Sequence, residues 1–166
     1  MRRFLHRHWH ALDDRERMLR VVQPGLIGLI DGTLSTLAPM FAMAYAVGSR
    51  AALIVGMAAA FGAAISMGLS EGLSDSGEVT GRGGAVQRGA VTGFGTFLGG
   101  SMHALPFLIS DIGTALALAY AFVGIELVAI AFVRRRYLAV PMRRSLLQVT
   151  FGGFVIAGVG IALGHS

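Results

Sequence analysis

Five apolar runs, each close to the length of a membrane span, constrain this chain more than any other feature of its sequence. They cover residues 24–47, 51–73, 89–109, 112–133 and 146–163, with approximate ends. A helix of about 20 apolar residues crosses the hydrocarbon core of a bilayer. Charged residues make up 14% of the 166 residues, below the roughly 25% of soluble domains, and the mean hydropathy is +0.67. We therefore expect an all-α integral membrane bundle of five transmembrane helices.

The arginines predict how this bundle is oriented. The chain has no lysine, and all of its 14 basic residues except Arg50 lie in three stretches: before the first run, between the second and third, and between the fourth and fifth. The positive-inside rule places such stretches in the cytosol. We expect a cytoplasmic N-terminus and a C-terminus outside. Because the arginines flank apolar runs, they indicate a lipid bilayer as the partner and no nucleic acid.

Residues 1–22 are predicted to form a cytoplasmic N-terminal segment, and residues 23–166 the membrane domain. The first segment carries charges throughout and has no apolar core, so we expect no cleavable signal peptide. Its apolar residues recur at approximately helical spacing, which indicates an amphipathic helix on the membrane surface. His6 and His10 are four residues apart and suit a shared metal ion, although a solvated helix face explains them more simply.

Asp31 is the most informative polar residue because it lies inside the first apolar run. A carboxylate at bilayer depth costs roughly 2.5–3.5 kcal/mol on insertion scales, and intramembrane acids usually serve a function. Gly28 and Gly32 leave room for a neighbouring helix. Pro39 has no N–H to bond the carbonyl of Ser35, so carboxylate and carbonyl oxygens become available to a divalent cation. The alternative is a protonated Asp31 that is hydrogen-bonded in a helix interface.

The second run contributes a thioether and several acids. Four of its residues follow the spacing i, i+4, i+8 and i+11, namely Met67, Glu71, Asp75 and Glu78. This spacing predicts one face of a helix. Thioether and carboxylate together suit Fe²⁺ better than Mg²⁺ or Ca²⁺, so Met67 and Glu71 are candidate metal ligands with Asp31. Asp75 and Glu78 would attract cations from the cytosol. The alternative is a solvated helix end whose acids pair with arginines of the following loop.

Two further polar residues lie inside apolar runs. Glu126, in the fourth run, is a candidate for proton coupling, and it is also in range to pair with Arg134, two turns along the helix. His103 stands before Pro106 near the outer end of the third run. It is either a hydrogen-bonded packing residue or a metal ligand on the exit side. Ser101 lies beside it, but no nucleophile motif accompanies the pair, and we expect no enzymatic activity.

Three motifs at these positions resemble the vacuolar iron transporter family. They are DGTLSTLAP in the first run, AAISMGLSE in the second and GGSMHALPFLI in the third. The similarity runs from about residue 23 to the end, and is closest to the membrane part of bacterial membrane-bound ferritins, the erythrin–vacuolar iron transporter proteins. The resemblance implies five transmembrane helices, a homodimer, and export of Fe²⁺ or Mn²⁺ from the cytosol in exchange for protons, here across a bacterial inner (plasma) membrane.

The same resemblance assigns transport-site roles to three residues, and the chain departs from the family pattern in two places. It implies that Asp31 and Met67 are transport-site residues and that Glu71 matches the Glu after the ISMG motif. The long Glu-rich insert of the family is reduced here to residues 74–88, and no ferritin-like Glu-x-x-His motifs are present. Cytosolic capture would then use the acidic stripe or a separate ferritin-like protein. We expect no permanently bound cofactor, because Fe²⁺ or Mn²⁺ is the substrate. The alternative is a non-transporting membrane anchor or assembly subunit of an iron-handling complex.

Overall fold

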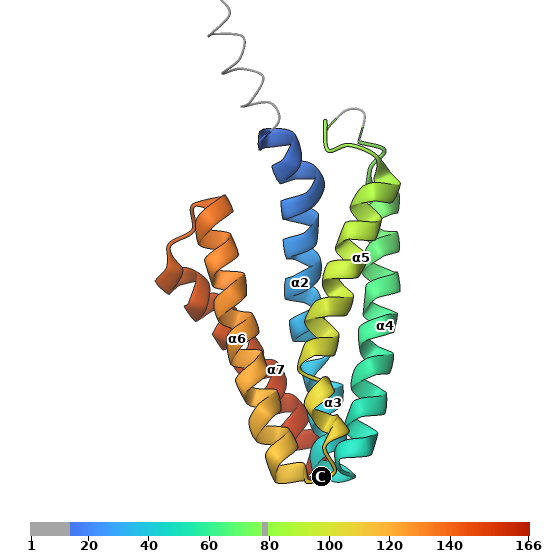
Figure 1. Ribbon diagram of the computed structural model, residues 1–166, viewed down its shortest axis with the longest axis vertical. Coiled ribbons are helices and arrows are strands. Elements are labelled where there is room, and N and C mark those ends of the chain that lie inside the picture. The colour runs from blue at the N-terminus through green and yellow to red at the C-terminus, as the bar shows by residue number, and fades with distance from the viewer. Residues whose placement is uncertain (1–13, 78–79) are drawn as a thin grey trace, which may run out of the picture.

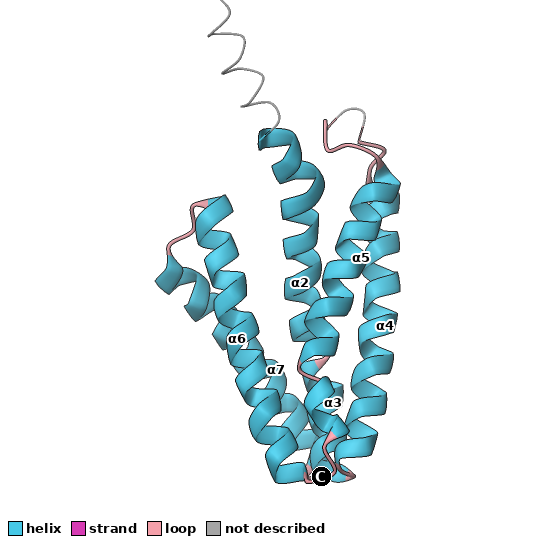
Figure 2. Ribbon diagram, in the orientation of Figure 1, coloured by secondary structure: helices cyan, strands magenta, loops and turns pink. Residues whose placement is uncertain are grey.

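The computed structural model describes residues 14–77 and 80–166, and all regular structure in these ranges is helical (Figure 2). The all-α prediction is confirmed. The helices share one long axis, and the described N-terminal end lies at the opposite end of the bundle from the C-terminus (Figure 1). Residues 1–13 of the expected N-terminal segment, with His6 and His10, lie outside the described residues, as does Glu78. Residues 14–22 of that segment belong to the same helical stretch as α2, so the structure shows no boundary at residue 22.

The described part of the chain passes along the bundle five times. In order, its elements are η1 (Met18–Val22, a π-helical turn), α2 (Gln23–Ser35), α3 (Leu37–Ala46), α4 (Ser49–Ser74), α5 (Ala85–Met102), η2 (Leu105–Leu108, a 3₁₀ turn), α6 (Ile112–Leu138) and α7 (Met142–Gly164). The first pass consists of α2 and α3 end to end, and α4, α5, α6 and α7 then alternate in direction (Figure 1).

Within the described residues, four helical stretches are long and apolar enough to cross a membrane. They are Asp14–Ala46, Ser49–Ser74, Ile112–Leu138 and Met142–Gly164. Helix α5 is less apolar because it combines Gln87 and Arg88 with many glycines and threonines. It lies between α2 and α4 and packs along both (Figure 1). The four apolar stretches are those expected of a multi-pass membrane protein.

The first pass is interrupted, whereas the sequence predicted one continuous helix. Helix α2 ends at Ser35 and α3 begins at Leu37, with Thr36 in a turn between them. Pro39 explains the break, because it cannot donate a hydrogen bond back to the carbonyl of Ser35. The Thr36 hydroxyl donates instead to the carbonyl of Gly32, at 2.9 Å.

Helix α4 ends before the predicted acidic stripe is complete. Its last residue is Ser74, and Asp75 has an extended backbone with φ −162° and ψ 133°. The prediction that Asp75 shares a helical face with Met67 and Glu71 was therefore wrong. The Asp75 carboxylate accepts hydrogen bonds from the Gly77 N–H, at 2.8 Å, and from the Thr80 hydroxyl, and these bonds favour a turn over another helical residue.

Glycines bring the helices around α5 close together. Gly28 and Gly32 of α2 lie against the backbone carbonyls of Thr92 and Thr96, and a Cβ at either glycine would overlap these atoms. On another side of α5, Gly89 lies against the backbone of Gly68 in α4. Such contacts between small residues are typical of helices that pack in lipid.

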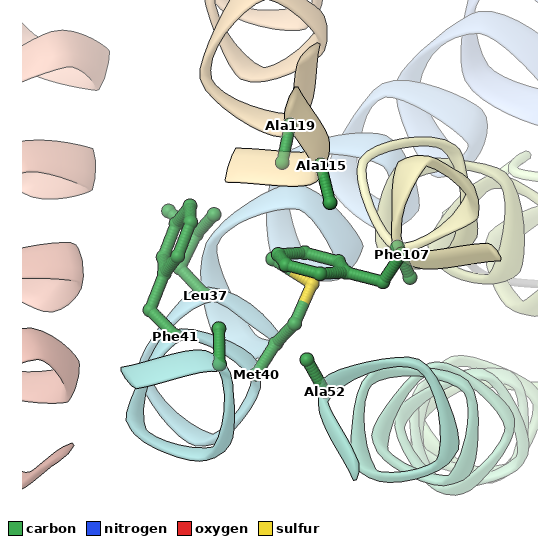
Figure 3. Packing of buried hydrophobic residues seen from close by; sticks show 9 residues of the cluster. Leu37, Met40, Phe41, Ala52, Phe107, Ala115 and Ala119 are labelled. Atoms are coloured by element: carbon green, nitrogen blue, oxygen red, sulfur yellow. The ribbon is translucent and has the colours of Figure 1, made fainter. Parts of the chain in front are cut away.

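At the other end of the bundle, where η2 lies, an apolar cluster holds several elements together. Seven of its buried side chains are labelled in Figure 3, namely Leu37, Met40, Phe41, Ala52, Phe107, Ala115 and Ala119. They come from α3, α4, η2 and α6, so one core fixes four elements at this end.

Candidate functional site

At the end of the bundle that holds the α4–α5 loop, Glu71 is held by two arginines. Its Oε1 atom accepts hydrogen bonds from Arg82 Nη2, at 2.7 Å, and from Arg88 Nε, at 3.0 Å. Arg88 is completely buried and also donates to the carbonyls of Gly83 and Asp75. This is the arginine pairing that the sequence left open for the acidic stripe. A cation that binds Glu71 must therefore compete with two guanidinium groups.

Asp75 belongs to the same loop. Its carboxylate lies 3.9 Å from Arg88 and accepts the two turn-closing bonds described above. The pKa of Asp75 is lowered from its ordinary value, first by the Thr80 hydroxyl and then by the Gly77 N–H. Asp75 therefore stays ionised while it orders the loop.

Asp31 lies on a different face of α2 from the glycines that contact α5. It is partly buried, and it shares its stripe with Ile27 and Ser35, which are both exposed in the single chain. Within the described residues, the Asp31 side chain makes no hydrogen bond and no ion pair. It is thus a carboxylate halfway along a membrane-length apolar stretch, on a surface that one chain leaves uncovered.

Met67 lies closer to the loop end than Asp31 does. Its neighbour Gly68 packs against Gly89 and Gly93 of α5, whereas Gly32, next to Asp31, packs against Thr96. The offset is roughly one helical turn, or about 5 Å along the axis. Met67 is partly buried on α4, and no hydrogen bond joins it to Asp31 in the described part of the chain.

The most complete polar network lies deeper in the bundle, and it joins three helices. Thr36 Oγ1 lies 2.8 Å from His103 Nε2, and His103 Nδ1 lies 2.9 Å from Glu126 Oε2. Thr36 and His103 are completely buried, and Glu126 is 4% exposed. Both nitrogens of His103 are thus engaged, and Glu126 pairs with His103 rather than with Arg134.

Two residues of these networks were not singled out as sites from the sequence. Arg88 was expected among the arginines that orient the chain or pair with the acidic stripe, but not as a buried residue at the start of α5. Thr36 was not identified as a site residue, although its hydroxyl links α2 to His103. One indication of its role was available in the sequence: Thr36 lies three residues before Pro39, which has no N–H to donate to the carbonyl of Ser35.

The residues 14–77 and 80–166 contain no group of three or more His, Cys, Asp or Glu side chains that could hold a metal ion. The acids are instead spread along the bundle in separate places. Comparison with known proteins adds no assignment: no family model matches the chain, and no curated protein or solved structure matches it.

Proposed function

We propose that this chain is a membrane transporter that exports Fe²⁺ or Mn²⁺ from the cytosol in exchange for protons. The observation that carries the proposal is Asp31, a carboxylate in a membrane-length apolar helix with no partner among the described residues. An ionised carboxylate facing lipid is costly, and a bound cation or a proton removes that cost. A ligand carboxylate must be deprotonated to bind metal, so the two occupants exclude each other.

The proposal includes a homodimer. Ile27, Asp31 and Ser35 form one stripe along α2 that the single chain leaves at least partly exposed. A second copy that covers this stripe would remove Asp31 from lipid and could bring further ligands to it. Homo-oligomers with two-fold symmetry are the commonest assemblies, and their axis places equivalent residues close to each other.

The order of polar groups along the bundle supports a route for cations. From the loop end, the groups are Glu71 with its arginines, then Met67, then Asp31, and then the Thr36–His103–Glu126 network. On this proposal Glu71 and Asp75 act near the cytosolic end. Met67 supplies a thioether that favours Fe²⁺ over harder ions. The protein acts in the bacterial inner membrane.

Proton exchange follows from the energetics of export. Moving two positive charges outward against 100 mV, inside negative, costs about 4.6 kcal/mol at 2.3 kcal/mol per charge. A passive pathway would therefore let metal in. Inward proton movement supplies the missing free energy.

A non-transporting membrane anchor is the second candidate. It is favoured by the internal pairing of Glu71 with arginines and of Glu126 with His103, because a purely structural protein needs such pairs. Asp31 does not fit this candidate, since it has no such pair. The anchor predicts that no metal binds, which titration calorimetry of the solubilised protein with Mn²⁺ will measure.

The decisive experiment uses inside-out proteoliposomes that contain a pH-sensitive dye. We expect wild-type protein to take up Fe²⁺ or Mn²⁺ and to move protons in the opposite direction. Asp31→Ala should abolish both signals, while Glu16→Ala, which removes an exposed acid paired with Arg20, should change neither. Equal transport by Asp31→Ala and wild type would eliminate Asp31 as the site.

A further inference from the structure

The Thr36–His103–Glu126 network fixes the position of its hydrogens. The Thr36 hydroxyl donates its only proton to the carbonyl of Gly32, at 2.9 Å. At the 2.8 Å contact with His103, Thr36 must therefore accept, and His103 Nε2 carries the hydrogen. The 2.9 Å contact between Nδ1 and Glu126 Oε2 then needs one more proton, because a bare nitrogen and a carboxylate oxygen are both acceptors.

That extra proton makes the pair neutral as a whole. It is either a neutral His103 with a protonated Glu126, or an imidazolium with a carboxylate. In both cases the His103–Glu126 pair holds one proton more than a neutral imidazole beside a carboxylate. Both side chains are buried, at 0% and 4% exposed, and either arrangement keeps the net charge of the pair at zero.

Loss of this proton would rearrange the network. The carboxylate of Glu126 then needs a donor, which it obtains when the remaining imidazole hydrogen moves to Nδ1. Nε2 becomes an acceptor, and the Thr36 hydroxyl must turn toward it and leave the Gly32 carbonyl. Gly32 directly follows Asp31 in α2, on the face that packs against α5.

We propose that the His103–Glu126 pair is a second proton-binding site of the exchange, besides Asp31, and that Thr36 links its occupancy to the Gly32 carbonyl of α2. This inference rests on the proposed function. When the pair loses its proton to solvent, the bundle gains one negative charge. This charge favours a divalent cation at Asp31, and a bound cation in turn favours loss of the proton. Binding of the metal ion and binding of this proton therefore oppose each other, as antiport requires.

Other titratable groups on the surrounding elements have different partners or positions. Tyr45 of α3 and Tyr120 of α6 bond each other at 2.9 Å. Arg134 of α6 bonds Ser145 and Gln148, and His165 after α7 bonds the carbonyl of Ile161. On α2, Asp31 lies on the exposed stripe; on α4 and α5, Glu71 and Arg88 pair at the loop end. The further charged residues of the surrounding helices are Arg50, Arg135, Arg136, Arg143 and Arg144, all exposed.

The buried atoms of the pair also leave a place for the proton to arrive. Glu126 Oε1 is buried and has no hydrogen-bond partner in the described chain, and the same is true of Thr33 Oγ1, one turn before Thr36. An unpartnered carboxylate oxygen in the interior is costly while Glu126 is ionised. Oε1 is therefore a second position at which Glu126 can take up a proton.

The test compares Glu126→Gln, Thr36→Val and Thr36→Ser in proteoliposomes. Glu126→Gln can still bond His103 but cannot ionise, so ⁵⁴Mn²⁺ counterflow should continue while fewer protons move per metal ion. Thr36→Val should lower the number of protons moved per metal ion, and Thr36→Ser should restore it. An unchanged proton-to-metal ratio in Glu126→Gln would overturn the inference while leaving the proposed function intact.

A second readout does not depend on transport. Histidine labelled with ¹⁵N reports which ring nitrogen carries hydrogen, and His103→Gln identifies the His103 signals. Raising the pH should move the hydrogen of wild-type His103 from Nε2 to Nδ1, and Glu126→Gln should abolish this change. A wild-type tautomer that stays constant over the pH range in which the protein is folded would overturn the inference. Absence of any wild-type metal movement, with the tautomer change present, would overturn the proposed function instead.

Discussion

Arg88 Nε lies 3.0 Å from Glu71 Oε1, and this contact ties the first turn of α5 to the last turns of α4. The same guanidinium reaches the carbonyls of Asp75 and Gly83, on the two sides of the connecting loop. A planar group with five donors can make such contacts at once, which lysine cannot do. Arg88 therefore holds the loop to the helix ends as well as neutralising Glu71.

Replacing Arg88 with methionine should destabilise the protein by about 3–5 kcal/mol, because Glu71 would lose its fully buried partner. The loop should open as well, so trypsin should cleave faster after Arg82. Unfolding in mixed micelles and timed proteolysis measure the two effects. Arg143→Met, at an exposed site, is the matched control. If both variants unfold at the same denaturant concentration, Arg88 does not stabilise the loop as described.

Adding a methyl group at Gly32 should separate α2 from α5. A Cβ at this position would overlap the backbone carbonyl of Thr96, and backbone cannot move aside as a flexible side chain can. We expect Gly32→Ala to cost about 1–3 kcal/mol or more. Gly62→Ala is the control, since a Cβ there meets no atom within 4 Å. Equal unfolding curves for the two variants would contradict the close packing of α2 on α5.

The turn at Asp75 should weaken in acid. The pKa of Asp75 in the folded chain lies below its ordinary value of 3.8. The stability that the ionised Asp75 carboxylate gives the fold is therefore complete above pH 3.8 and is lost as the pH falls through the folded pKa. Hydrogen exchange at the Gly77 amide will measure how stable the turn is at each pH. Protection should fall below pH 3.8 in the wild type and be low at every pH in Asp75→Ala. Asp111→Ala, at the start of α6, should leave Gly77 unchanged.

Met67→Leu should change metal preference with little effect on folding. Leucine keeps the approximate volume of methionine but lacks the sulfur, which is the softer ligand. On the proposed function, Fe²⁺ uptake should fall about tenfold relative to Mn²⁺ uptake, or about 1.4 kcal/mol. Met57→Leu, on the same helix, should leave the ratio unchanged. A constant Fe²⁺ to Mn²⁺ ratio in Met67→Leu would exclude a ligand role for the sulfur.

Hydropathy predicted the approximate position of each helix, and four of the described helical stretches are long and apolar enough to cross a membrane. The third run is the exception, because α5 ends at Met102 and the 3₁₀ turn η2 follows. The first run is broken at Thr36, and further errors lie at polar helix ends. Helix α7 begins at Met142 rather than near residue 146, since Arg143 and Arg144 form its first turn despite their charge. Helix α4 ends at Ser74 because the Asp75 side chain bonds the following backbone, a local choice that spacing alone does not reveal.

The pairing of polar residues could not be predicted to the same degree. Glu126 was identified as an isolated acid and His103 as an isolated histidine, but their contact depends on how α6 crosses the end of α5. Arg134 was the nearer candidate along the sequence for Glu126. It bonds Ser145 and Gln148 of α7 instead, because the short connection from α6 to α7 brings those residues opposite it.

The break at Thr36 attaches the two halves of the first pass to different neighbours. Helix α2 is packed tightly on α5, whereas α3 rests on α7, where Gly160 and Gly164 lie against the backbone of Ala38 and Ala42. The chain therefore has a joint at Thr36, between a unit containing α2, α4 and α5 and a unit containing α6 and α7. Rocking of one unit against the other would bend the first pass at this joint, and it would also shift α3 and α6 against α4 within the apolar cluster that joins them.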